Sequence, residues 1–159
     1  MIREQVTPEE WRVLYAAPWA VGWYMATAIG GKVQEVRELL TLRTTLHQTL
    51  ERDCEHDLIG AIAATVLSET PSEMRWSWQP GDRPAMLRAV AAAWSVATRL
   101  PSGRAFRHWL MELARDVAAA EKDGGWMGVG AEAIHRAEQT ALNDLAVVLE
   151  IETDTRLTT

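Results

Sequence analysis

Apolar residues recur along much of the chain at intervals of three or four, the spacing that places side chains on one face of an α-helix. Two such stripes stand out in the sequence: Leu39, Leu42, Leu46 and Leu50, and Phe106, Trp109, Leu110, Leu113 and Val117. Alternation of apolar and polar residues, the pattern typical of a half-buried strand, is rare. The pattern therefore predicts helices and almost no sheet.

The first predicted helix has a complete start signal. Thr7 can cap it, Pro8 fits its first turn, and Glu10 completes a capping box. Because proline lacks an N–H group, Pro18 should bend the helix near Ala17. Glycines at positions 30 and 31 should end it.

Glycine, proline and helix-capping residues divide the rest of the chain into predicted helices and connections. A second helix should run from Val33 to the low fifties, and a short, buried one should cover positions 58–67. An irregular connection over 68–84 follows, and Asp82 can cap the next helix. A fifth helix should precede a glycine-rich loop over 124–130, and the last should start near His135. We expect one all-α domain over residues 1–152, a compact bundle of about six to seven helices, with a polar tail over 153–159.

Composition and charge narrow the class of protein. The chain has 159 residues, of which 48% are hydrophobic, and a net charge of −6. Its arginines are scattered, which argues against a nucleic-acid surface. No apolar run is long enough to span a membrane, and the first residues do not resemble a signal peptide. The single cysteine, Cys54, suits a reducing compartment, so we expect a cytoplasmic protein.

Tryptophan is unusually frequent, with eight residues in the chain. Core packing explains most of them, but Trp76 and Trp78 lie in the proline-bounded connection. In an extended segment the two rings would point to the same side. They could fold back on the core or contact a partner, and Trp126 in the glycine-rich loop could join that contact.

Metal binding is the second candidate chemistry. His47, Glu51 and Cys54 could share one helix face, and His56 lies close by in sequence. Asp53 and His56, and Glu132 and His135, are pairs of a carboxylate and a histidine three residues later, a spacing that also occurs in di-iron bundles. Such bundles need further carboxylates that point inward from the other helices. Glu112 is the carboxylate near the apolar stripe of the fifth helix. The alternative is that these polar residues are solvated on helix surfaces.

Two further candidates have weaker support. The glycine-rich loop could cradle a phosphate, but no strand precedes it and no phosphate-loop lysine follows, which favours a turn. Cys54 could form a nucleophilic dyad with His47 or His56, although a lone cysteine on an apolar helix side is usually a buried hydrophobe. The sequence thus contains no motif that assigns an enzymatic activity.

Two segments resemble the TerB-like domain of tellurite-resistance proteins: residues 109–149 with Asp123-Gly124-Gly125, and residues 8–38 with Gly30-Gly31. The resemblance implies paired helices, a role in bacterial stress or resistance, and metal binding at acidic turn residues. Asp123 and Glu138 match the acidic positions of the second unit, whereas Ile29 stands at the acidic position of the first.

The sequence therefore favours a non-enzymatic helical module. Such a module would bind a protein partner or a small molecule through Trp76, Trp78 and Trp126, and it could do so as a homodimer. The alternative is a helical protein that binds a divalent metal through its histidine, cysteine and acidic residues.

Overall fold

The structure is a computed structural model that describes residues 2–28, 32–52, 57–69, 78–79, 81–123 and 131–152, with the backbone alone at 32–40, 52, 57, 121–123 and 131–135. Over these residues it is all-helical and contains no strand, which confirms the predicted fold class. A short 3-10 helix (Ile2–Gln5) precedes six α-helices: α1 (Pro8–Ala26), α2 (Lys32–Arg52), α3 (Asp57–Ser68), α4 (Arg83–Ala97), α5 (Gly103–Asp123) and α6 (Ala131–Val148).

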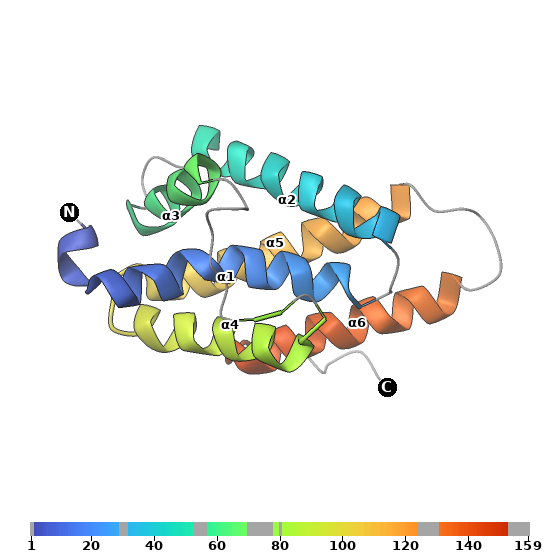
Figure 1. Ribbon diagram of the computed structural model, residues 1–159. Coiled ribbons are helices and arrows are strands. Elements are labelled where there is room, and N and C mark those ends of the chain that lie inside the picture. Colours follow the sequence, from blue (N-terminus) through green and yellow to red (C-terminus); the bar gives the residue numbers. More distant parts are fainter. Residues whose placement is uncertain are drawn as a thin grey trace.

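Helix α1 is the central element of the bundle. It contacts each of the five other α-helices. Figure 1 shows it between α2 and α3 on one side and α4 and α6 on the other, with α5 behind it. Its residues from Ala17 to Gly22 are buried without interruption. A helix that is buried all round must be apolar all round, and the run of small and apolar residues in this segment meets that requirement.

The predicted start of α1 is confirmed in atomic detail. The Glu10 backbone N–H donates to the Thr7 hydroxyl at 3.2 Å, and the Thr7 N–H donates to the Glu10 carboxylate at 2.9 Å. Thr7 is therefore the N-cap of a reciprocal capping box. The helix continues through Pro18, so the proline does not end it.

Other predicted boundaries also agree with the structure. Asp82 caps α4, because its carboxylate accepts a 3.1 Å hydrogen bond from the Ala85 N–H. The buried short helix expected over 58–67 is α3. The last helix differs: α6 begins at Ala131 rather than near His135, so helical backbone starts directly after the glycine-rich segment.

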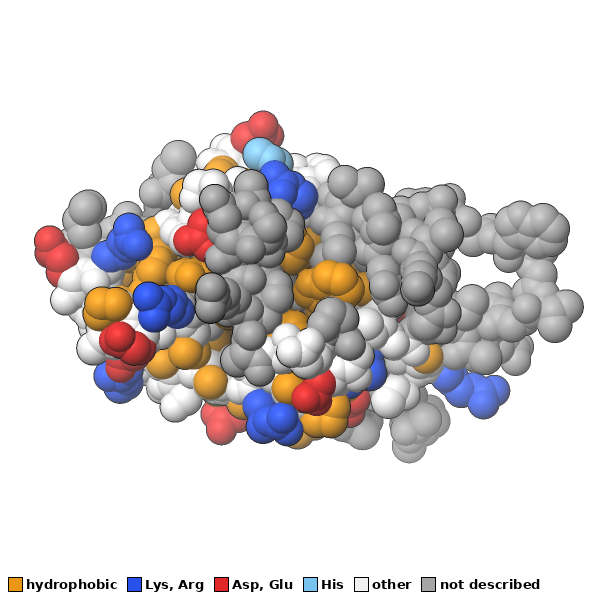
Figure 2. Space-filling view, viewed as in Figure 1, with side chains coloured by type: hydrophobic (Ala, Val, Ile, Leu, Met, Phe, Trp, Pro, Cys, Tyr) orange, Lys and Arg blue, Asp and Glu red, His pale blue; other side chains and the backbone are white. Residues whose placement is uncertain are grey.

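Buried side chains from all six α-helices join in one hydrophobic core. The largest fully buried ones include Leu14, Met25, Phe106 and Leu145. In the described part of the face shown in Figure 2, basic and acidic side chains are interspersed. Within the described residues, none of the helices has both the length and the apolar character that crossing a membrane requires.

Candidate functional site

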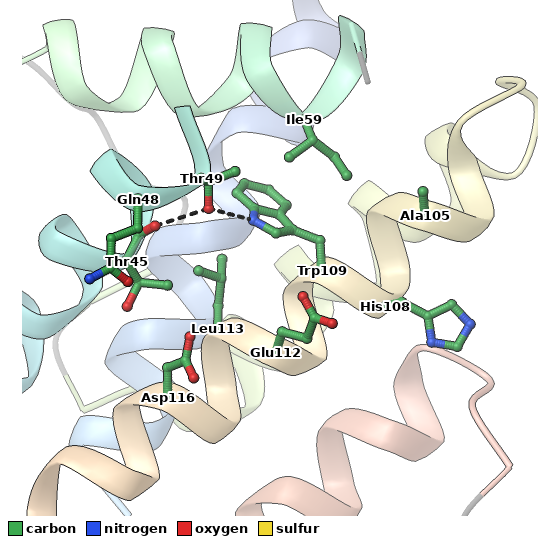
Figure 3. A pocket seen from close by; sticks show the side chains of 10 residues that line it. All are labelled: Thr45, Gln48, Thr49, Ile59, Ala105, His108, Trp109, Glu112, Leu113 and Asp116. Atoms are coloured by element: carbon green, nitrogen blue, oxygen red, sulfur yellow. Dashed lines mark hydrogen bonds between the residues drawn. The ribbon is translucent and has the colours of Figure 1, made fainter. Parts of the chain in front are cut away.

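A pocket of about 310 Å³ lies between α2 and α5, with one residue of α3 at its edge. Figure 3 shows the side chains that surround it. They are Thr45, Gln48, Thr49, Ile59, Ala105, His108, Trp109, Glu112, Leu113 and Asp116. The volume is at the lower end of the range for small-molecule sites in proteins.

The apolar part of the pocket belongs to the hydrophobic core. Ile59, Trp109 and Leu113 line it, and all three are buried. Leu113 and Trp109 lie on the apolar stripe of α5, where the Trp109 ring also meets the Phe106 ring at a centroid distance of 6.1 Å. Because these side chains are packed from behind, this part of the pocket is a rigid wall.

One hydrogen-bond chain fixes the Trp109 ring. Its indole N–H donates to the Thr49 hydroxyl at 3.2 Å, and that hydroxyl donates to the Thr45 carbonyl oxygen at 2.9 Å (Figure 3). Thr49 thus acts as acceptor and donor at once, which is the full use of one hydroxyl proton. The chain joins α5 to α2 across the pocket and holds the indole in one orientation.

The polar part of the pocket comes mainly from α5. His108, Glu112 and Asp116 follow one another at intervals of four residues, so they share one side of the helix. All three are exposed, as is Gln48 on α2. In Figure 3 the His108 ring points away from Trp109. Among the described side chains of the lining, Glu112 and Asp116 are carboxylates and none is a lysine or arginine.

A second polar cluster joins α1, α4 and α6. The Tyr24 hydroxyl donates to the Asp144 carboxylate at 2.6 Å, and the Arg83 guanidinium lies 3.9 Å from the centre of the Tyr24 ring. Arg83 also donates to the Tyr24 carbonyl oxygen and to the Thr27 hydroxyl near the end of α1. Burial of the phenol, and then its hydrogen bond to Asp144, raise the pKa of Tyr24. The groups of this cluster contact one another and join three helices, so we assign it a structural role. We take the α2–α5 pocket as the candidate site.

Of the three tryptophans predicted to contact a partner or ligand, the structure describes only Trp78. Trp78 is 5% exposed and belongs to the core, so its ring folds inward and is not a surface contact. Trp76 and Trp126 lie outside the described residues. Of the other described tryptophans, three are buried and Trp23 and Trp94 are half-buried, as expected for core packing.

The predicted metal ligands are not gathered at one place in the described part of the chain. His47 and Glu51 are exposed on α2, while Cys54 and His56 lie outside the described residues. Asp123 is the last residue of α5, with only its backbone described, and Glu138 is buried in α6. Among the described side chains, no three His, Cys, Asp or Glu residues form a group able to hold a metal ion.

The sequence does not predict the pocket. It marks Glu112 as a carboxylate near the apolar stripe of the fifth helix, and nothing in it distinguishes His108 or Asp116. Their regular spacing is visible in the sequence, but the pairing of α5 with α2 is not.

Comparisons with known proteins supply no family. No protein-family model matches the chain, and neither the curated proteins nor the solved structures gave a match. The resemblance to the TerB-like domain therefore stays a prediction.

Proposed function

We propose that this protein is a helical binding module that holds a small molecule in the pocket between α2 and α5. One observation carries the proposal: a concave site of about 310 Å³ combines a buried apolar wall with an exposed polar edge. Small-molecule sites generally have this composition, in which apolar surface supplies affinity and a few polar groups fix orientation.

The rigidity of the wall supports a binding role. Trp109 is packed in the core on one side and hydrogen-bonded through Thr49 on the other. A ligand that contacts this ring does not have to order it first, so little conformational entropy is lost on binding. The polar groups at the edge are exposed and can adapt to the ligand.

A small molecule is favoured over a protein partner because the site is a hollow of small volume. A TerB-like role in stress or resistance would be compatible with such a module.

The test compares two neighbouring threonines of α2. Thr45 lines the pocket, whereas Thr44 is exposed and does not. Thr45→Met would fill part of the pocket, and Thr44→Met would make the same change outside it. Methionine is a better helix former than threonine, so both variants should keep the helix.

A library of small fragments would be screened against the unchanged protein by ligand-observed NMR. We expect some fragments to bind, Thr45→Met to lose that binding, and Thr44→Met to keep it. Circular dichroism would confirm that both variants are folded. The proposal fails if no fragment binds, or if the two variants bind the same fragments equally well.

A further inference from the structure

We draw no further inference here: the strongest candidate, the side-chain cluster of Trp94, Arg107 and Glu150 where α4, α5 and the end of α6 meet, consists of contacts that join these parts of the chain to one another, and no second observation among the described residues points to a ligand or partner there.

Discussion

The indole N–H of Trp109 donates a 3.2 Å hydrogen bond to the hydroxyl of Thr49, sixty residues away in sequence. This contact links α5 to α2 at the wall of the pocket, and a further bond from Thr49 to the Thr45 carbonyl oxygen extends it. The fold and the candidate site therefore share one interaction: the bond that holds the two helices together also holds the ring that a ligand would meet.

A double-mutant cycle should detect this bond. Thr49→Val leaves the buried Trp109 N–H without its acceptor, which we expect to lower the free energy of unfolding by about 1–3 kcal/mol. Trp109→Phe removes the donor and part of the packed ring. Because the bond is already absent in either single variant, the double variant should lose about 1 kcal/mol less than the sum of the single losses. Urea unfolding gives the free energy of unfolding of the unchanged protein, the two single variants and the double variant. If the losses of the two single variants add up to the loss of the double variant, the bond is contradicted.

Gly103 should not tolerate a side chain. A Cβ atom there would lie 2.0 Å from the Ala97 carbonyl oxygen, which is backbone at the end of α4. A Cβ atom at Gly22 would meet the Cδ2 atom of Leu42 at 2.6 Å, but a side-chain tip can move more easily. In α1 the gain in helix propensity, about 1 kcal/mol, also offsets part of the clash.

We therefore expect Gly103→Ala to lower the free energy of unfolding by about 1–3 kcal/mol, and Gly22→Ala to lower it less. Thermal unfolding of both variants tests this order. A larger loss at Gly22 would show that the close approach of α1 and α2 is the tighter constraint.

The buried phenol of Tyr24 should make the fold sensitive to alkaline pH. Its pKa in the folded protein is raised above the ordinary value of about 10, first by burial and then by the hydrogen bond to Asp144. The unfolded chain therefore ionises first as pH rises. Stability is complete below about pH 10 and falls as the pH rises from there through the folded pKa.

Tyr24→Phe should reduce that loss, and at neutral pH it should cost about 1 kcal/mol through the missing hydrogen bond. Burial also raises the pKa of Tyr15, so Tyr15→Phe should reduce the loss as well, and it is measured for comparison. Urea unfolding at several pH values between 7 and 11 gives, for each protein, the slope of the unfolding midpoint against pH. A Tyr24→Phe slope as steep as that of the unchanged protein would contradict this role.

Glu150 occupies the left-handed position after α6, with φ at 53°. The Ile151 N–H reaches back to the Ala146 carbonyl oxygen at 2.9 Å, as in a Schellman ending, where glycine is usual. Glu150 also accepts hydrogen bonds from the Trp94 indole at its side chain and from Arg107 at its carbonyl oxygen.

Glycine relieves the backbone strain at this position and alanine does not, while both lose the carboxylate that Trp94 contacts. Glu150→Gly should therefore be more stable than Glu150→Ala by about 1 kcal/mol in thermal unfolding. Equal stability of the two variants would show that the left-handed conformation carries no strain.

Local signals in the sequence predicted much of the fold. Thr7 with Glu10, and Asp82, mark helix starts because capping is a contact between residues three apart. The stripe that contains Phe106 and Trp109 predicted the buried face of α5, because residues three or four apart lie on one face of a helix. The sequence predicts the start of α6 four residues late, near His135, because the first residues of the helix, Ala131 to Ile134, follow glycines and no clear capping residue precedes them.

The pocket could not be predicted in the same way. It depends on the packing of α5 against α2, and Thr49 and Trp109 carry no mark in the sequence that pairs them. The inward position of Trp78 is likewise a tertiary effect, since an extended segment can turn its rings toward the core or toward solvent. The spacing of His108, Glu112 and Asp116 places them on one side of a helix but does not show what that side faces.

The most direct measurement follows the indole N–H signals of the eight tryptophans by ¹H–¹⁵N NMR while a pocket ligand from the fragment screen is added. Trp109→Phe identifies the Trp109 signal by its loss. If the pocket is the binding site, the Trp109 signal should shift in a saturable manner, and Thr45→Met should abolish the shift. A Trp109 signal that stays in place while the ligand binds and other indole signals move would contradict the assignment of the site.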